Sequence, residues 1–162
     1  MNSGVMSNGK EWRSRLASLR EKGTIVFTNG CFDLLHTGHI KYLRQAKALG
    51  DYLIVGLNDD ASVKSLKGPE RPIVPLEGRA EVLQALEMVD LVIPFSGQTA
   101  ERLVAEVRPD IYVKGGDYKL EEIPEAVVAE RNGSKVKILS LEQGWSTSRI
   151  IADVLARYQK GE

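Results

Sequence analysis

Both histidines of the 162-residue chain lie in one short segment, His36-Thr37-Gly38-His39. A β-branched run ending at Asn29-Gly30 precedes this segment and apolar residues at helical spacing follow it, which indicates a turn between a strand and a helix. The first N–H groups of a helix bind anions, and Gly38 lets the backbone approach them closely. Because imidazoles also donate hydrogen bonds to phosphate oxygens, the segment predicts a phosphate-binding turn in which His36 and His39 stabilise developing negative charge.

Two other interpretations of the histidines compete with this one. A histidine beside apolar residues is more often structural than catalytic, but the placement of both in one turn favours function. A transition-metal site would lack ligands, because Cys31 is the only further histidine or cysteine in the sequence. We expect Cys31 to be a small buried residue with no nucleophilic chemistry.

A second group of candidates lies in the stretch 64–76, which contains three prolines and the basic residues Lys64, Lys67 and Arg71. Prolines at this density are typical of a loop, so we predict a basic loop. On sequence alone, Lys64 and Lys67 fit a solvated helix end as well as they fit a functional site. Arg71 is the better candidate because a proline-stiffened loop holds its guanidinium in place. Arg79, on the following helix, fits either the site or a surface ion pair with a glutamate of its own helix.

Two further segments complete the candidates. Lys114-Gly115-Gly116-Asp117 follows a predicted strand, where glycines allow a nucleobase or sugar to lie against the backbone. Asp117 would either bind hydroxyl groups there or hold the loop. Ser146-Thr147-Ser148 precedes an apolar helix; one hydroxyl suffices as its N-cap, and the others, with the free N–H groups, would bind phosphate.

The elements that must position these residues alternate regularly along the chain. An amphipathic helix ending near Gly23 precedes the first predicted strand, and about five strands then alternate with helices. The predicted strands are 24–28, 52–57, 91–93, 111–113 and 136–139, and the predicted helices between and after them include 40–50, 77–87, 98–107, 122–131 and one after 146–148. Right-handed crossovers make this an α/β fold with a doubly wound, open parallel sheet, whose ligand crevice lies at the carboxyl ends of the strands. We expect a flexible N-terminal tail over 1–10 and a single domain over 11–160.

The composition excludes several classes of partner. The chain has 22 Lys+Arg and 22 Asp+Glu, so no global field attracts nucleic acid or an anionic membrane. No apolar run approaches the roughly 20 residues that span a bilayer. One cysteine forms no internal disulfide, which agrees with a reducing compartment, and we expect a cytoplasmic protein.

The chain resembles the HxGH class of nucleotidyltransferases, which includes cytidylyltransferases and bacterial heptose 1-phosphate adenylyltransferases. The resemblance runs from about Thr28 to Ile151, and it is carried by the segments 30–33 (Gly-Cys-Phe-Asp), 36–39, 64–68 (Lys-Ser-Leu-Lys-Gly), 71–72, 113–118 (Val-Lys-Gly-Gly-Asp-Tyr) and 145–151 (Trp-Ser-Thr-Ser-Arg-Ile-Ile). Among these, Asn29-Gly30-Cys31-Phe32-Asp33, the Lys-Gly-Gly-Asp-Tyr segment and the Gly-x-Ser-Thr-Ser ending are most similar to the heptose branch. The resemblance thus implies a Rossmann-like nucleotidyltransferase fold and transfer of AMP from ATP to D-glycero-β-D-manno-heptose 1-phosphate, giving ADP-heptose and pyrophosphate.

The resemblance also implies roles for individual residues. Mg²⁺ would enter with ATP on its phosphates rather than on direct protein ligands, and the protein would be a homodimer. Asp33 would contact the acceptor or the metal, with a turn-capping role as the alternative. The implied catalytic residues are His36, His39 and Lys64; the implied ATP-binding residues are Thr28, Asn29, Gly30, Cys31, Phe32, Gly38, Gly115, Asp117, Ser146, Thr147 and Ser148; and the implied substrate-binding residues are Asp33, Lys67, Arg71 and Lys114.

One departure and several alternatives remain open. Cytidylyltransferases carry an arginine before the Ser-Thr-Thr start of the last helix, whereas positions 141–145 here contain none, and Arg149 is a candidate substitute. A sibling enzyme could adenylate or cytidylate another small phosphate, such as glycerol 3-phosphate or a pantetheine derivative, since the residues alone do not declare the base. A non-catalytic ATP-binding regulatory module and a protein-contact scaffold are the alternatives of other classes.

Overall fold

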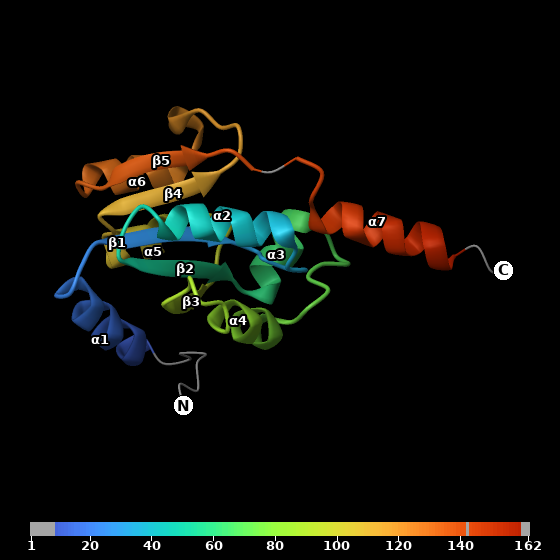
Figure 1. Ribbon diagram of the computed structural model, residues 1–162, viewed down its shortest axis with the longest axis horizontal. Helices are drawn as coiled ribbons and strands as arrows, with labels where there is room; N and C mark the ends of the chain where they lie inside the picture. The colour runs from blue at the N-terminus through green and yellow to red at the C-terminus, as the bar shows by residue number, and fades with distance from the viewer. Residues whose placement is uncertain (1–8, 142, 160–162) are drawn as a thin grey trace.

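The computed structural model describes residues 9–141 and 143–159, and it contains a parallel five-stranded sheet in the order β3-β2-β1-β4-β5 with helices on both faces (Figure 1). The predicted doubly wound, Rossmann-like α/β fold is therefore confirmed. The strands are β1 (Ile25–Gly30), β2 (Tyr52–Asn58), β3 (Leu91–Phe95), β4 (Ile111–Gly115) and β5 (Lys135–Leu139), and the helices are α1 (Gly9–Arg20), α2 (Thr37–Lys47), α3 (Asp60–Lys67), α4 (Leu76–Gln84), α5 (Glu101–Val107), the short 3₁₀ helix η1 (Leu120–Glu122), α6 (Pro124–Arg131) and α7 (Thr147–Tyr158).

The central strands are apolar along their length because both faces of the sheet are covered. Residues 25–28 of β1 and 53–58 of β2 are buried, as expected for parallel strands between two helical layers. One hydrophobic core joins the sheet to α1, α5 and α6, and the other joins it to α2 and α4. Trp12 and Leu16 pack α1 into the first of these cores, so the amphipathic first helix lies outside the sheet as its spacing predicts.

The order of the strands reverses between β1 and β4, which are neighbours in the sheet. From this pair the chain winds toward β3 on one side and toward β5 on the other. Because successive connections leave in opposite directions there, the loops after β1 and β4 leave a crevice between them at the carboxyl ends of the strands. The segments 31–36 and 116–119 follow these two strands, which places the predicted phosphate turn at that point.

Helix caps explain where the prediction of elements succeeds and where it is wrong. Ser146 caps α7 by accepting a hydrogen bond from the Arg149 N–H at 3.1 Å, as predicted for the hydroxyl cluster. The predicted loop over 64–76 is wrong at both ends, because residues 64–67 belong to α3 and Leu76 begins α4. The Asp59 side chain caps α3 by accepting from the Ser62 N–H at 2.8 Å, and the helix then continues to Lys67.

The chain ends differ in how far the structure describes them. Gly9 and Lys10, placed in the predicted tail, belong to α1, while the rest of that tail and residues 160–162 lie outside the described residues. Within the described part of the chain, no helix is long and apolar enough to cross a bilayer.

Candidate functional site

A cavity of about 540 Å³ opens at the carboxyl ends of the strands, where the order of the sheet reverses. It brings together segments that are far apart in the sequence: the turn after β1, the end of α3, the loop after β4 and the start of α7. The predicted site residues that line it are Asn29, Gly30, Cys31, Phe32, Asp33, His36, Gly38, His39, Lys67, Arg71, Lys114, Gly115, Ser146, Thr147 and Ser148.

The two histidines lie at the start of α2 with their rings stacked. His36 is the N-cap residue, with extended backbone, and its ring centroid lies 3.8 Å from that of His39 at an interplanar angle of 21°. The Nδ1 atoms of both are buried and have no hydrogen-bond partner among the described residues. Burial lowers the pKa of His36, and burial together with the neighbouring His36 lowers the pKa of His39 to about 4. The free protein therefore holds two neutral imidazoles with unused polar atoms at a helix N-terminus.

Gly38 is required between the histidines by packing. A Cβ at this position would lie 3.0 Å from the Cε1 and Nδ1 atoms of His36 and 3.2 Å from the Cβ of Trp145. The Trp145 ring stacks on His36 with centroids 6.2 Å apart and an interplanar angle of 22°. Three rings thus form a column, with Trp145 outermost and half exposed.

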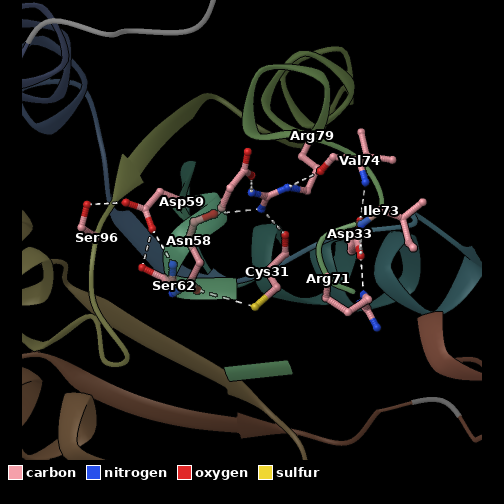
Figure 2. A network of polar contacts seen from close by, with 11 residues as sticks. Cys31, Asp33, Asn58, Asp59, Ser62, Arg71, Ile73, Val74, Arg79 and Ser96 are labelled. Atoms are coloured by element: carbon pink, nitrogen blue, oxygen red, sulfur yellow. Dashed lines mark hydrogen bonds and ion pairs between the residues drawn. The ribbon is translucent and has the colours of Figure 1, made fainter. Parts of the chain in front are cut away.

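The carboxylate of Asp33 is buried and holds the loop that precedes α4. It accepts hydrogen bonds from Arg71 Nε at 2.5 Å and from the backbone N–H groups of Ile73 and Val74 at 2.9 Å (Figure 2). Burial raises the pKa of Asp33, but the hydrogen bonds from Val74, Ile73 and Arg71 outweigh burial and lower it. These contacts resemble the turn-capping alternative for Asp33 more closely than an acceptor contact, and they occupy the Nε of Arg71.

Arg79 is buried behind the cavity lining, so of the two alternatives for it the surface ion pair with Glu77 or Glu81 is wrong. Its side chain is 0% exposed and donates to the carbonyl oxygens of Val74, Cys31 and Asn58 at 2.7–2.9 Å and to the Asp60 carboxylate at 2.7 Å. Figure 2 shows the guanidinium of Arg79 at the junction of these segments. Residues two apart on a helix point in different directions, which is why Glu77 and Glu81 are not its partners.

A hydroxyl network fixes the end of β2 to the loop after β3. The Asp59 carboxylate accepts from the hydroxyl groups of Ser62 and Ser96, each at 2.5 Å (Figure 2). Asn58 Nδ2 donates to the Gly97 carbonyl at 3.1 Å. The cavity wall formed by this loop is therefore held rigidly against β2.

Three predicted site residues lie outside the cavity lining. The Thr28 hydroxyl is buried and hydrogen bonded to the Tyr42 hydroxyl at 2.6 Å, while Lys64 and Asp117 are exposed. Their assigned roles stay predictions. Lys67, by contrast, lines the cavity, and its charge acts against the rise in the pKa of Cys31 that burial causes.

Several lining residues were missed by sequence reasoning: Tyr42, Asn58, Leu66, Gln98, Tyr118, Glu125, Leu141 and Trp145. Asn58 and Gln98 follow the rule that ligands meet the carboxyl ends of strands, since one ends β2 and the other lies in the loop after β3. Trp145 adjoins the hydroxyl cluster. Glu125 gives no such signal, because a glutamate in the first turn of a helix is ordinary.

The sequence is similar to known proteins along most of its length. The profile of the Cytidylyltransferase-like family matches residues 27–153. A protein described as Bifunctional protein HldE, from Chromohalobacter salexigens, is 54% identical over 145 residues, which are 88% of this chain and 30% of that protein. A protein of the same description from Pectobacterium carotovorum is 49% identical over 158 residues, which are 97% of this chain and 33% of that protein. The chain thus spans about a third of the length of these relatives.

Two solved structures resemble this one. A lipopolysaccharide core biosynthesis protein from Thermoplasma volcanium has a TM-score of 0.61 and 32% identity, covering 74% of this chain and 97% of that chain. A pantoate-beta-alanine ligase from Francisella tularensis has a TM-score of 0.60 and 15% identity, covering 98% of this chain and 80% of that chain, and at this identity it shares the fold alone.

Proposed function

We propose that this chain, which belongs to the cytidylyltransferase-like family, transfers AMP from ATP to D-glycero-β-D-manno-heptose 1-phosphate and releases pyrophosphate. The observation that carries the proposal is the stacked pair His36 and His39 at the N-terminus of α2, whose buried Nδ1 atoms have no partner in the part of the chain that the structure describes. Buried polar atoms are normally hydrogen bonded, so this unmatched pair on two imidazoles that line a cavity supports a functional rather than a structural role for them. Phosphate oxygens fit this position because the helix N-terminus also favours an anion.

In the proposed reaction, a phosphate oxygen of the acceptor forms a bond to the α-phosphorus of ATP. The bond from that phosphorus to the bridging oxygen breaks, and pyrophosphate leaves with the electron pair. A phosphate nucleophile is already ionised, so the protein needs no general base. His36 and His39 donate hydrogen bonds to the departing phosphates, the hydroxyl groups at the start of α7 bind phosphate from the other side, and Lys67 balances negative charge.

Mg²⁺ belongs to the proposal as a companion of ATP. Among the described residues, no group of three or more histidine, cysteine, aspartate or glutamate side chains is placed to hold a metal ion. The carboxylate of Asp33 is already engaged by Arg71 and two backbone N–H groups. When bound on the phosphates, Mg²⁺ neutralises charge that develops during transfer.

The choice of acceptor and base depends on the resemblance of the motifs. The segments 29–33, 113–118 and 144–148 support the heptose branch, and a solved relative named for lipopolysaccharide core biosynthesis is consistent with a sugar acceptor. A reaction that consumes ATP also accords with the expected cytoplasmic location.

The test is an incubation of the protein with Mg²⁺, the heptose phosphate and each of ATP, CTP, GTP and UTP in turn, with pyrophosphate and product mass recorded. Pyrophosphate with ATP, together with the mass of ADP-heptose, is the expected result. Product with CTP, or with glycerol 3-phosphate as acceptor, would replace the proposal by the sibling enzyme. Binding of ATP without pyrophosphate for any acceptor would favour the regulatory module.

We also propose that the protein is a homodimer, as the resemblance implies. Support comes from α7, which extends away from the sheet (Figure 1). Ile151, Val154, Leu155 and Tyr158 follow helical spacing on one side of α7, and none of them is buried. Sedimentation equilibrium tests this proposal, and a monomeric mass at micromolar concentration would contradict it.

A further inference from the structure

Glu125 is a buried carboxylate that lines the cavity. It lies in the first turn of α6 and is 4% exposed, and its Oε1 accepts a hydrogen bond of 3.0 Å from the backbone N–H of Ala100. No cation among residues 9–141 and 143–159 forms an ion pair with it. Because an ionised carboxylate accepts hydrogen bonds at about four positions, most of its capacity is unused.

The phenol of Tyr112 lies near Glu125. Burial and the nearby charge of Glu125 raise the pKa of Tyr112, whose hydroxyl group donates to Asn29 Oδ1 at 2.8 Å. That bond engages the amide oxygen of Asn29, a residue that also lines the cavity. Gln98, in the loop after β3, adds a second amide. This end of the cavity thus offers a carboxylate and amides.

Glu125 and the two histidines belong to helices that pack on opposite faces of the sheet, so they mark two different ends of the cavity. The histidines belong to α2, which packs in the core on one face of the sheet, whereas α5 and α6 pack in the core on the other face. A negative charge at the α6 end repels phosphate, so phosphates belong at the α2 end. A buried carboxylate without a cation is costly unless hydrogen-bond donors surround it, and uncharged hydroxyl groups are such donors.

We propose that Glu125 is a specificity-determining residue that binds the hydroxyl groups of the acceptor's sugar while the phosphate of the acceptor points toward the histidines. This inference depends on the proposed function for the identity of the acceptor. The acceptor is favoured over the ribose of ATP because Glu125 holds Ala100, in the loop after β3, and Gln98 of that loop donates to Ser65 of α3 at 3.0 Å. Lys67, which the resemblance assigns to acceptor binding, ends this helix, whereas the residues assigned to ATP at 146–148 start α7.

The test compares wild type with Glu125→Gln, which keeps an oxygen for the Ala100 N–H and removes the charge. Glu130→Gln is the matched control, since Glu130 is exposed on the same helix and lies outside the cavity. We expect Glu125→Gln to raise both the KM and the calorimetric Kd for the heptose phosphate by at least about tenfold, with the Kd for ATP nearly unchanged. Glu130→Gln should match wild type in all three values.

Two outcomes would overturn the inference: unchanged acceptor affinity in Glu125→Gln, or weaker binding of ATP with acceptor affinity unchanged, which would assign Glu125 to the ribose. A failure of the proposed function would be distinguished from a failure of this inference, because wild type would then show no turnover with the heptose phosphate. In that case the calorimetric comparison continues with mannose 1-phosphate and inorganic phosphate. Glu125→Gln should weaken binding of the sugar phosphate and leave inorganic phosphate unaffected, and equal loss for both ligands would contradict the role assigned to Glu125.

Discussion

The Asp33 carboxylate and the Arg71 guanidinium form a 2.5 Å ion pair across 38 positions of sequence, with the Asp33 side chain 0% exposed and that of Arg71 13% exposed. This pair closes the loop 68–75 onto the turn that carries the histidines. A buried pair of this kind is costly to break because the remaining partner stays desolvated.

We expect Asp33→Ala to lower the free energy of unfolding by about 2–4 kcal/mol, since it removes the acceptor for Arg71 and for two backbone N–H groups. Urea unfolding of Asp33→Ala, Arg71→Ala and the double variant measures the coupling, which should exceed about 1 kcal/mol. The exposed pair Arg102–Glu106 is the control, and its coupling should be small. Additive effects of Asp33 and Arg71 would show that the pair contributes nothing.

Arg79→Lys should also destabilise the protein, by about 2–4 kcal/mol, because one ammonium group cannot replace a fork that reaches three carbonyl oxygens and a carboxylate. Thermal unfolding measures the change. Arg108→Lys is a suitable control, as Arg108 is exposed and outside the cavity. A melting temperature within a degree or so of wild type would mean that lysine satisfies these carbonyl groups.

His39→Ala should reduce turnover by on the order of 10² or more, as expected when one preorganised donor to a developing charge is lost. The circular dichroism spectrum should not change, because the backbone of α2 does not depend on the ring. Pyrophosphate release under saturating ATP gives the measurement. Near-normal turnover would reduce His39 to a structural residue.

The lowered pKa of His39 should also make the stability of the protein depend on pH. Its pKa is about 4 in the folded protein against 6.5 ordinarily, so above about pH 6.5 both states are neutral and stability is flat. As the pH falls from about 6.5 to about 4, the unfolded state binds a proton that the folded state does not, and stability declines. Asp33 and Asp59 act in a more acidic range, since their pKa values lie below 3.8.

Urea unfolding at several pH values in this range checks the expectation, and His39→Gln should make the decline shallower, leaving the part that comes from the lowered pKa of His36. ATP should oppose it, because bound phosphate favours the protonated imidazole. Binding of ATP near pH 6 would then take up protons, which calorimetry detects by comparing buffers of different ionisation enthalpy. Equal heats of ATP binding in all buffers would contradict proton uptake on binding.

Local patterns predicted the fold because they depend on near neighbours in sequence: strand composition, helical spacing and the Ser146 cap are all visible within a few residues. The position of the phosphate turn followed from the fold. Arg79 could not be assigned in this way, since its partners Cys31 and Asn58 lie 48 and 21 positions away. The same holds for Glu125, whose burial depends on how α5 and α6 pack together.

The sequence and the structure favour different lysines of α3. The resemblance assigns catalysis to Lys64, whereas Lys67 lines the cavity. Both belong to α3 and are exposed, so alanine at either position should leave the fold intact. If the cavity is the site, Lys67→Ala should lower kcat/KM by about tenfold or more through the loss of a charge facing the phosphates, and Lys64→Ala should change it less than about threefold. Raising the salt concentration should reduce the difference in kcat/KM between wild type and Lys67→Ala, since salt screens an exposed charge. A larger loss in Lys64→Ala would restore the role that the motif assigns to Lys64 and would require α3 to approach the substrates differently.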